Sequence, residues 1–363
     1  MLSVHLIAAV RPNFMKVAPL FHVLAKSGWC KPVLVHTGQH YDFNMSDAFF
    51  QDLGLPEPDY HLGVGSGSHA EQTAGVMVAY EKVLLETMPD WVIVVGDVNS
   101  TIACTLAAKK LCLRVAHLEA GLRSRDWAMP EEINRMVTDA IADVLWTPSQ
   151  DGDENLLAEG VAPERISFVG NIMIDSYELL RDRIEQETTR GDFGLEAGTY
   201  GVVTLHRPSN VDHREALKVL VETLTAAASD VPLVFALHPR TKKNLEQFDL
   251  YETLGHAEGV HLSGPLSYIR FMGLVREAKL VITDSGGIQE ETTYLGIPCL
   301  TLRDTTERPV TISEGSNCLA TTVELSGLID TVLAGEWPIG KCPDLWDGNT
   351  AVRVMDDIRR RSA

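Results

Sequence analysis

The segment DSGGIQEETTYLGIP, residues 284–298, combines two features that attract different chemical groups. A Ser-Gly-Gly turn that opens a helix offers free backbone N–H groups and the positive end of the helix dipole, which together bind anions. Two adjacent acids, Glu290 and Glu291, follow in the same segment and would repel an anion close to them. A nucleoside diphosphate would satisfy both features, because its phosphates suit the turn and its ribose hydroxyls can donate hydrogen bonds to a carboxylate.

Only one of the two acids can face such a ligand, because neighbouring residues of an α-helix point about 100° apart. We expect Glu291 to accept hydrogen bonds from the 2′- and 3′-hydroxyls of the ribose and Glu290 to have a structural role. The N–H groups of Ser285, Gly286 and Gly287 are expected to hold the diphosphate.

Three basic residues are candidates for binding an anion. Arg11 and Lys16 stand in AAVRPNFMKVAPL, residues 8–20, around an expected helix start. Two cations at the amino end of a helix oppose its dipole, so anion binding explains them better than helix stability does. Arg308, in RDTTERPVTISEGSN, is placed to add charge at the phosphates.

Three acids are candidates for proton transfer. Asp97 follows an apolar run in GDVNST, although it could also cap the next helix. Glu119 and Glu131 stand in HLEAGLRSRDWAMPEEINR, where Glu131 and Glu132 begin a helix whose dipole favours them. Three carboxylates that converge on one site would raise the pKa of at least one of them, which is how a general acid or base near neutral pH is made.

A histidine follows another apolar run, in TLHRPSN, residues 204–210. Such a histidine often has a purely structural hydrogen-bonding role. The Pro-Ser-Asn loop after it keeps His206 near the surface, so we expect it to take part in binding or catalysis.

The elements that position these residues alternate short apolar runs with amphipathic stretches, which is typical of repeated β-α units. Near-continuous Val, Ile and Leu runs indicate strands covered on both faces. We therefore predict two doubly wound, Rossmann-like α/β domains, at residues 1–172 and 173–345, with a cleft between them. The expected strands lie within residues 4–10, 31–38, 91–97, 114–121, 143–149 and 166–171, then 200–207, 231–239, 260–264, 280–287 and 298–304.

Ligand-binding groups of doubly wound folds come from the carboxyl ends of the strands. The polar residues at these positions are Arg11, Lys16, Gln39, His40, Asp97, His117, Glu119, His206, Arg207, His238, Asp284, Ser285, Arg303 and Arg308. We expect about half of them to cap helices or to pair with each other.

Composition limits the possible partners. The chain has 363 residues, 45% of them hydrophobic, which is enough for two cores, and its net charge of −19 argues against nucleic acid and anionic membranes. No apolar run reaches the ~18 residues that span a bilayer, and the amino end does not resemble a signal peptide.

Six cysteines without CxxC spacing predict a reduced, cytoplasmic protein. We predict no cofactor, since neither a metal cluster nor a Gly-rich dinucleotide fingerprint is evident.

The motifs together resemble the non-hydrolysing UDP-N-acetylglucosamine 2-epimerases, a family with the two-domain GT-B architecture. The resemblance covers nearly the whole chain and rests on RPNFMK, TGQH, GDVNST, HLEAGLRS, PEEINR, VGNIMID, HRPSN, DSGGIQEE and RDTTERP, in that order. It implies reversible epimerisation at C2 of UDP-GlcNAc to UDP-ManNAc, through loss of UDP and its re-addition to a 2-acetamidoglucal.

The resemblance also implies residue roles. The catalytic residues would be Asp97, Glu119, Glu131 and His206, of which the sequence does not say which acid removes the proton and which returns it. The substrate-binding residues would be Arg11, Lys16, Arg135, Ser285, Gly286, Gly287, Glu291 and Arg308. A last helix, within residues 346–363, would pack back on the first domain, and the protein would be a homodimer.

Three segments depart from the family's usual pattern. The first usually reads Gly-Thr-Arg-Pro-Glu, where this chain has AVRPN at residues 9–13, and His-Arg-Arg-Glu-Asn becomes HRPSN. Tyr41 and Asp42 replace a pair used for allosteric binding in bacterial members, so we do not expect activation by UDP-GlcNAc.

The alternatives to a non-hydrolysing epimerase are a hydrolysing epimerase that releases UDP and ManNAc, a GT-B glycosyltransferase that uses a UDP-sugar, and a catalytically silent binding protein.

Overall fold

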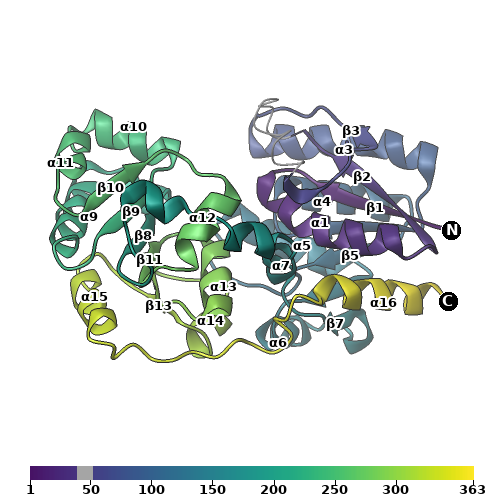
Figure 1. Cartoon of the computed structure of the whole chain (residues 1–363). Coiled ribbons are helices and arrows are strands. Elements are labelled where there is room, and N and C mark those ends of the chain that lie inside the picture. The colour runs from purple at the N-terminus through teal and green to yellow at the C-terminus, as the bar shows by residue number, and fades with distance from the viewer. Residues whose placement is uncertain (39–51) are drawn as a thin grey trace. The chain divides into compact units, whose positions relative to one another are not determined.

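The chain folds into two α/β units, each built on its own parallel sheet (Figure 1). The structure, a computed structural model, describes residues 1–38 and 52–363. The first unit consists of Met1–Leu179 and Asp344–Ala363, and the second of Leu180–Pro343. The predicted fold class, with two doubly wound Rossmann-like sheets, is confirmed.

The first sheet has seven strands in the order β3-β2-β1-β4-β5-β6-β7, and every pairing is parallel. The strand order reverses between β1 and β4, which is where doubly wound sheets bind ligands. The strands are β1 (Leu2–Ala8), β2 (Cys30–His36), β3 (Tyr60–His61), β4 (Trp91–Val95), β5 (Val115–Leu118), β6 (Val144–Thr147) and β7 (Ile166–Phe168).

Helices flank this sheet and begin at residues that favour helix starts. A proline occupies the first turn of both α1 and α5, and Ser68 caps α3 by accepting a hydrogen bond from the Glu71 N–H. The helices are α1 (Arg11–Lys26), α3 (His69–Thr87), α4 (Asn99–Lys110), α5 (Pro130–Ile141), α6 (Gln150–Ala158), α7 (Ile172–Glu185) and α16 (Thr350–Ser362). The division between the units falls within α7, and α16 packs against α1.

The second sheet repeats the winding, in the order β10-β9-β8-β11-β12-β13, with all pairs parallel. Its reversal point lies between β8 and β11. The strands are β8 (Gly201–Thr204), β9 (Leu233–Ala236), β10 (Val260–Ser263), β11 (Leu280–Thr283), β12 (Cys299–Thr301) and β13 (Asn317–Leu319).

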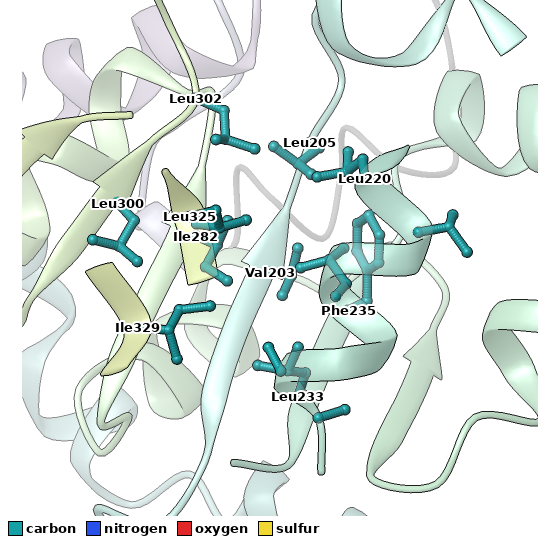
Figure 2. Close-up of a cluster of buried hydrophobic side chains, with 14 of the residues drawn as sticks. Val203, Leu205, Leu220, Leu233, Phe235, Ile282, Leu300, Leu302, Leu325 and Ile329 are labelled. Carbon is teal, nitrogen blue, oxygen red and sulfur yellow. The ribbon is translucent and has the colours of Figure 1, made fainter. Parts of the chain in front are cut away.

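A hydrophobic core lies between this sheet and helices that include α9 and α15 (Figure 2). Val203, Phe235 and Ile282 of the strands pack with Leu220 and Leu325 of the helices, and all are at most 2% exposed. The helices of the unit are α8 (Pro208–Val211), α9 (Arg214–Ala227), α10 (Pro239–Gln247), α11 (Tyr251–Gly255), α12 (Tyr268–Val275), α13 (Gly286–Leu295), α14 (Val310–Ser313) and α15 (Leu325–Leu333).

Each strand predicted from an apolar run is present, and β3 and β13 are additional. Among the described residues, no helix is both long and apolar enough to cross a membrane. Cys30, Cys104 and Cys299 are buried, as their apolar surroundings predict, whereas Cys112 and Cys342 are exposed.

Candidate active site

Two acids lie side by side where neighbouring strands of the first sheet end. Asp97 and Glu119 each follow a strand, and the register pairs Val95 of β4 with Leu118 of β5. The Gly96 N–H continues this pairing by donating a 3.0 Å hydrogen bond to the Leu118 carbonyl. Gly96 has a φ of 68°, and a Cβ there would lie 3.3 Å from Oε2 of Glu119. A glycine therefore suits the position next to the two acids.

Lys16 of α1 forms an ion pair with Oε2 of Glu119. Glu119 is 2% exposed and has a φ of 70°, a conformation that residues with a side chain rarely adopt. Its other oxygen, Oε1, is buried and has no hydrogen-bond partner among the residues that the structure describes. One oxygen is thus held by a cation, while the other is available to take up a proton.

Arg135 of α5 connects Asp97 to this helix. Its Nε lies 3.3 Å from Oδ2 of Asp97, and its Nη1 lies 3.0 Å from Oε2 of Glu132. The neighbouring Asn134 donates a 2.8 Å hydrogen bond to the Asp97 carbonyl. Glu131 precedes Arg135 by four residues, so both lie on the same face of the helix. Asp97 pairs with an arginine and does not cap α4, which has no side-chain cap.

The adjacent acids Glu131 and Glu132 differ in environment. Glu132 is 1% exposed and accepts hydrogen bonds from the Ser124 N–H and hydroxyl, both 3.0 Å, and from the Arg125 N–H, 2.8 Å. Its carboxylate therefore holds the loop before α5. Glu131 is only partly buried, as an acid that meets a substrate must be.

A histidine and an aspartate meet where β8 and β11 end in the second unit. Asp284 is fully buried and accepts hydrogen bonds from the N–H groups of His206 and Arg207 and from the amide of Asn210. Nδ1 of His206 lies 2.9 Å from Oδ1 of Asp284, and the His206 side chain is 40% exposed. Burial opposes ionisation of Asp284, but the hydrogen bonds and charge of His206 outweigh it and lower the pKa of Asp284. The carboxylate thus orients an imidazole that solvent reaches.

The Ser-Gly-Gly turn opens α13 without a side-chain cap. Ser285 is its N-cap residue, but its N–H, which we expected to hold a diphosphate, donates a 3.0 Å hydrogen bond to the Thr283 hydroxyl in this structure. A Cβ at Gly287 would have no atom within 4 Å. A Cβ at Gly286 would lie 2.8 Å from both Nη1 of Arg308 and Oε1 of Glu307, so a guanidinium and a carboxylate that pairs with it both lie beside the first turn. Arg308 is fixed by an ion pair in which its Nε lies 2.8 Å from Oε1 of Glu290. This helix start has no side-chain cap, open space at Gly287 and a guanidinium beside it, which suits phosphate, and Glu290 and Glu307 hold that guanidinium in place.

Glu291 faces a different neighbour from Glu290. It is 4% exposed, and its Oε1 accepts a 2.6 Å hydrogen bond from the hydroxyl of Tyr268 on α12. Burial raises the pKa of Glu291 to about 8, although the Tyr268 hydrogen bond lowers it. The two adjacent acids thus have different partners, as the helical offset between them requires.

Contacts within each unit connect several of the predicted residues. In the first unit, Lys16 pairs with Glu119, Arg135 pairs with Asp97, and Glu131 lies one turn before Arg135 on α5. In the second unit, His206 pairs with Asp284, the residue before Ser285, and Arg308 lies beside Gly286, with Gly287 and Glu291 on the same helix. Arg11 begins α1, but its side chain lies outside the described part of the chain, as do Gln39, His40, Tyr41 and Asp42. Tyr268 was missed because nothing in the sequence pattern of α12 points to it. No group of three or more described His, Cys, Asp or Glu residues could hold a metal ion.

Comparison with protein families gives a match over most of the chain. Residues 22–359 match the model of the family described as UDP-N-acetylglucosamine 2-epimerase. The UDP-N-acetylglucosamine 2-epimerase of Methanocaldococcus jannaschii is 42% identical over 325 residues, which are 88% of each chain. The UDP-2,3-diacetamido-2,3-dideoxy-D-glucuronate 2-epimerase of Pseudomonas aeruginosa is 38% identical over 317 residues, or 86% of each chain.

A solved structure has the same fold. The crystal structure of the Methanocaldococcus jannaschii UDP-GlcNAc 2-epimerase in complex with UDP-GlcNAc and UDP superposes with a TM-score of 0.89 at 39% sequence identity. The match covers 99% of this chain and 100% of that one.

Proposed function

The chain belongs to the UDP-N-acetylglucosamine 2-epimerase family, and from this premise we propose that it interconverts UDP-N-acetylglucosamine and UDP-N-acetylmannosamine by inverting C2. The hydrogen on C2 has no carbonyl group beside it, so its removal alone would be strongly uphill. Loss of the proton is therefore coupled to departure of UDP from C1. The C–H electron pair forms the C1–C2 double bond of a glycal, and the C1–O pair leaves with UDP. Re-addition of UDP and protonation of the other face of C2 give the epimer without net hydrolysis.

The observation that carries the proposal is the pairing of Glu119 with Lys16 beside Asp97 and Arg135. Inversion at C2 needs one group that removes a proton and another that returns one. Glu119 has an unpaired buried oxygen, Oε1, that suits proton removal, and Lys16 holds the charge of its other oxygen. Asp97 and Glu131 are the acids proposed to serve the opposite face of C2.

Departure of UDP requires groups that stabilise the diphosphate as its charge grows. The turn of Ser285, Gly286 and Gly287 and the guanidinium of Arg308 are proposed to hold it, with Arg11 adding charge. His206, oriented by the buried Asp284, is proposed to donate a proton or hydrogen bond to the leaving oxygen. In this proposal residues 180–343 hold UDP, with Glu291 on the ribose. Residues 1–179 and 344–363 supply the acids.

Incubation in deuterated water tests the reaction. The purified protein is mixed with UDP-GlcNAc and followed by NMR, and we expect UDP-ManNAc with deuterium at C2 and with UDP still attached. Net accumulation of free UDP and ManNAc would show a hydrolysing epimerase. Turnover that requires an added sugar acceptor would show a glycosyltransferase, and the absence of any exchange would contradict an enzymatic role.

A second substrate is suggested by the relative from Pseudomonas aeruginosa. Its substrate, by name, has an acetamido group at C3 and a carboxylate at C6, and the same C2 chemistry applies to it. The incubation is therefore repeated with that UDP-sugar. A larger kcat/KM for it than for UDP-GlcNAc would assign the chain to the diacetamido-glucuronate substrate.

The remaining features follow from the family resemblance. We expect a cytoplasmic homodimer that needs neither a metal nor a redox cofactor. Sedimentation velocity measures the assembly state, and turnover after treatment with a chelator measures the metal requirement.

A further inference from the structure

A buried network of charged side chains lies directly beneath the acid cluster of the first unit. His117 of β5 and Asp139 of α5 are at most 1% exposed, and neither belongs to the residues proposed to touch the substrate. Nδ1 of His117 lies 2.6 Å from Oδ1 of Asp139, and its Nε2 lies 2.8 Å from the carbonyl oxygen of Gly96. Both ring nitrogens thus face oxygen atoms, and a ring with a proton on each nitrogen would donate to both.

Asp139 connects the His117 ring to a second turn. Its Oδ2 accepts a 3.1 Å hydrogen bond from the Gly121 N–H and a 2.8 Å bond from Nη1 of Arg123. Arg123 in turn forms a bidentate pair with Glu159, at 2.8 and 2.7 Å. Burial opposes ionisation of Asp139, but the charges of His117 and Arg123 outweigh it and lower the pKa of Asp139. Arg123 is thus held by two carboxylates, the buried Asp139 and the exposed Glu159.

The two backbone groups that this network holds flank the two central acids. Gly96 immediately precedes Asp97, and Gly121 follows Glu119 by two residues. Gly96, Glu119 and Gly121 all have positive φ values, of 68°, 70° and 79°. Glycine adopts such values without strain, but Glu119 holds this conformation only because its surroundings restrain it. The linked side chains of His117, which contacts Gly96, and Asp139, which contacts Gly121, supply such a restraint.

We propose that His117 and Asp139 are positioning residues that fix the turn of Asp97 relative to the turn of Glu119, and so set on which face of C2 the proton returns. The inference rests on the proposed epimerisation. A network that only stabilised the unit would change the amount of folded protein. A positioning network also changes how the glycal is partitioned between return to the starting sugar and passage to the epimer.

Two variants separate these roles. His117→Asn retains a donor for Asp139 but has none that reaches the Gly96 carbonyl, whereas Asp139→Asn preserves the shape of the network and removes one charge. The matched control is Asp357→Asn on α16, a carboxylate 7% exposed that accepts 2.8 Å hydrogen bonds from Nε1 of Trp146 and Nε of Arg361. This control is also buried in the first unit and contributes nothing to the proposed site.

The measurement is the early ratio of C2 deuterium in recovered UDP-GlcNAc to that in UDP-ManNAc, together with kcat, KM and the melting temperature. This ratio does not depend on the fraction of enzyme that is folded. A misplacement of about 1 Å in a reacting group can cost about 10²-fold in rate. We therefore expect His117→Asn to lower kcat by about 10²-fold at similar KM and to shift the ratio about tenfold. Asp139→Asn should have a smaller effect of the same kind, and Asp357→Asn should leave the ratio unchanged.

An unchanged ratio in His117→Asn, or an equal shift in Asp357→Asn, would overturn the positioning role. Two-bond ¹H–¹⁵N spectra of histidine-labelled protein test the protonation of the His117 ring without depending on enzyme activity. One ring should carry protons on both nitrogens, and its signals should be absent from His117→Asn. A neutral ring at this position would overturn the network as described. If the wild-type protein does not incorporate deuterium at C2, the proposed function is contradicted. The NMR spectra then still test whether His117 donates to both Asp139 and Gly96.

Discussion

The hydroxyl of Tyr268 donates a 2.6 Å hydrogen bond to Oε1 of Glu291, joining α12 to α13 in the second unit. Glu291 is buried, and burial raises its pKa to about 8 against the effect of this hydrogen bond. The carboxyl proposed to hold the ribose is thus largely protonated at neutral pH, although the ribose hydroxyls bind its ionised form better. Nucleotide binding and the ionisation of Glu291 are therefore coupled.

The first prediction concerns this coupling. UDP affinity should rise as the pH increases from about 7 to about 9, a range in which phosphate groups, with a second pKa near 6, are already ionised. Tyr268→Phe removes a hydrogen bond that lowers the pKa of Glu291, so the profile should move about one unit towards higher pH. Titration calorimetry with UDP measures this shift. The control Glu291→Gln should show no rise, and a Tyr268→Phe profile identical to the wild type would contradict the coupling.

The second prediction concerns stability. The folded pKa of Glu291, about 8, lies above its ordinary value of 4.5, so the folded state binds more protons between these limits. The free energy of unfolding should therefore fall as the pH rises through this window, by up to about 1.4 kcal/mol for each unit of pKa shift. Glu291→Gln mimics the protonated acid, so the free energy of unfolding of this variant should not fall in this pH window. It should match the wild type near about pH 5 and exceed it above about pH 8 in urea denaturation.

The adjacent acid supplies the control for the second prediction. Glu290→Gln removes one of the two carboxylates that pair with Arg308, the other being Glu307, and should destabilise the protein. It also removes a negative charge that raises the pKa of Glu291, so stability should still fall as the pH rises, but the fall should end at a lower pH than in the wild type. A Glu291→Gln variant with the wild-type slope would show that Glu291 is not the titrating group.

The strand-end rule explains which parts of the site the sequence could predict. Asp97, Glu119 and Asp284 follow apolar runs, and parallel strands bring their carboxyl ends to one edge of a sheet whatever the details of packing. Tyr268 and Asp139 come from helices, and which side of a helix faces a given strand end depends on tertiary packing that periodicity alone does not determine.

The same reasoning applies to the strands that the sequence did not predict. β3 has two residues and β13 has three, and both lie at sheet edges, where no long apolar run is needed. The adjacent pair Glu131 and Glu132 is a comparable case in the site. Both acids suit the first turn of a helix. Their roles differ only because the loop at Arg125 donates a hydrogen bond to Glu132, a contact that the sequence does not predict.

The third prediction concerns the last helix. Asp175 accepts hydrogen bonds from the N–H groups of Thr350, 3.1 Å, and Ala351, 2.7 Å, and so caps α16 from a distant part of the chain. Asp175→Ala should cost about 1–2 kcal/mol, as the loss of a helix cap does. Hydrogen exchange should then become faster in residues 350–362, as measured by mass spectrometry. Equal acceleration throughout the first unit would indicate global destabilisation and contradict a local capping role.

The fourth prediction separates the neighbouring acids of α5. Glu132→Gln removes the buried one of the two carboxylates that pair with Arg135, leaving Asp97, and weakens the loop at Ser124, so it should destabilise the protein by about 3 kcal/mol. Glu131→Gln changes a partly exposed acid that is proposed to transfer a proton, so it should lower kcat by about 10²–10⁴-fold at unchanged stability. Urea denaturation and kinetics with UDP-GlcNAc measure the two effects. The reverse result, a stable but inactive Glu132→Gln beside an active Glu131→Gln, would move the proton-transfer role from Glu131 to Glu132.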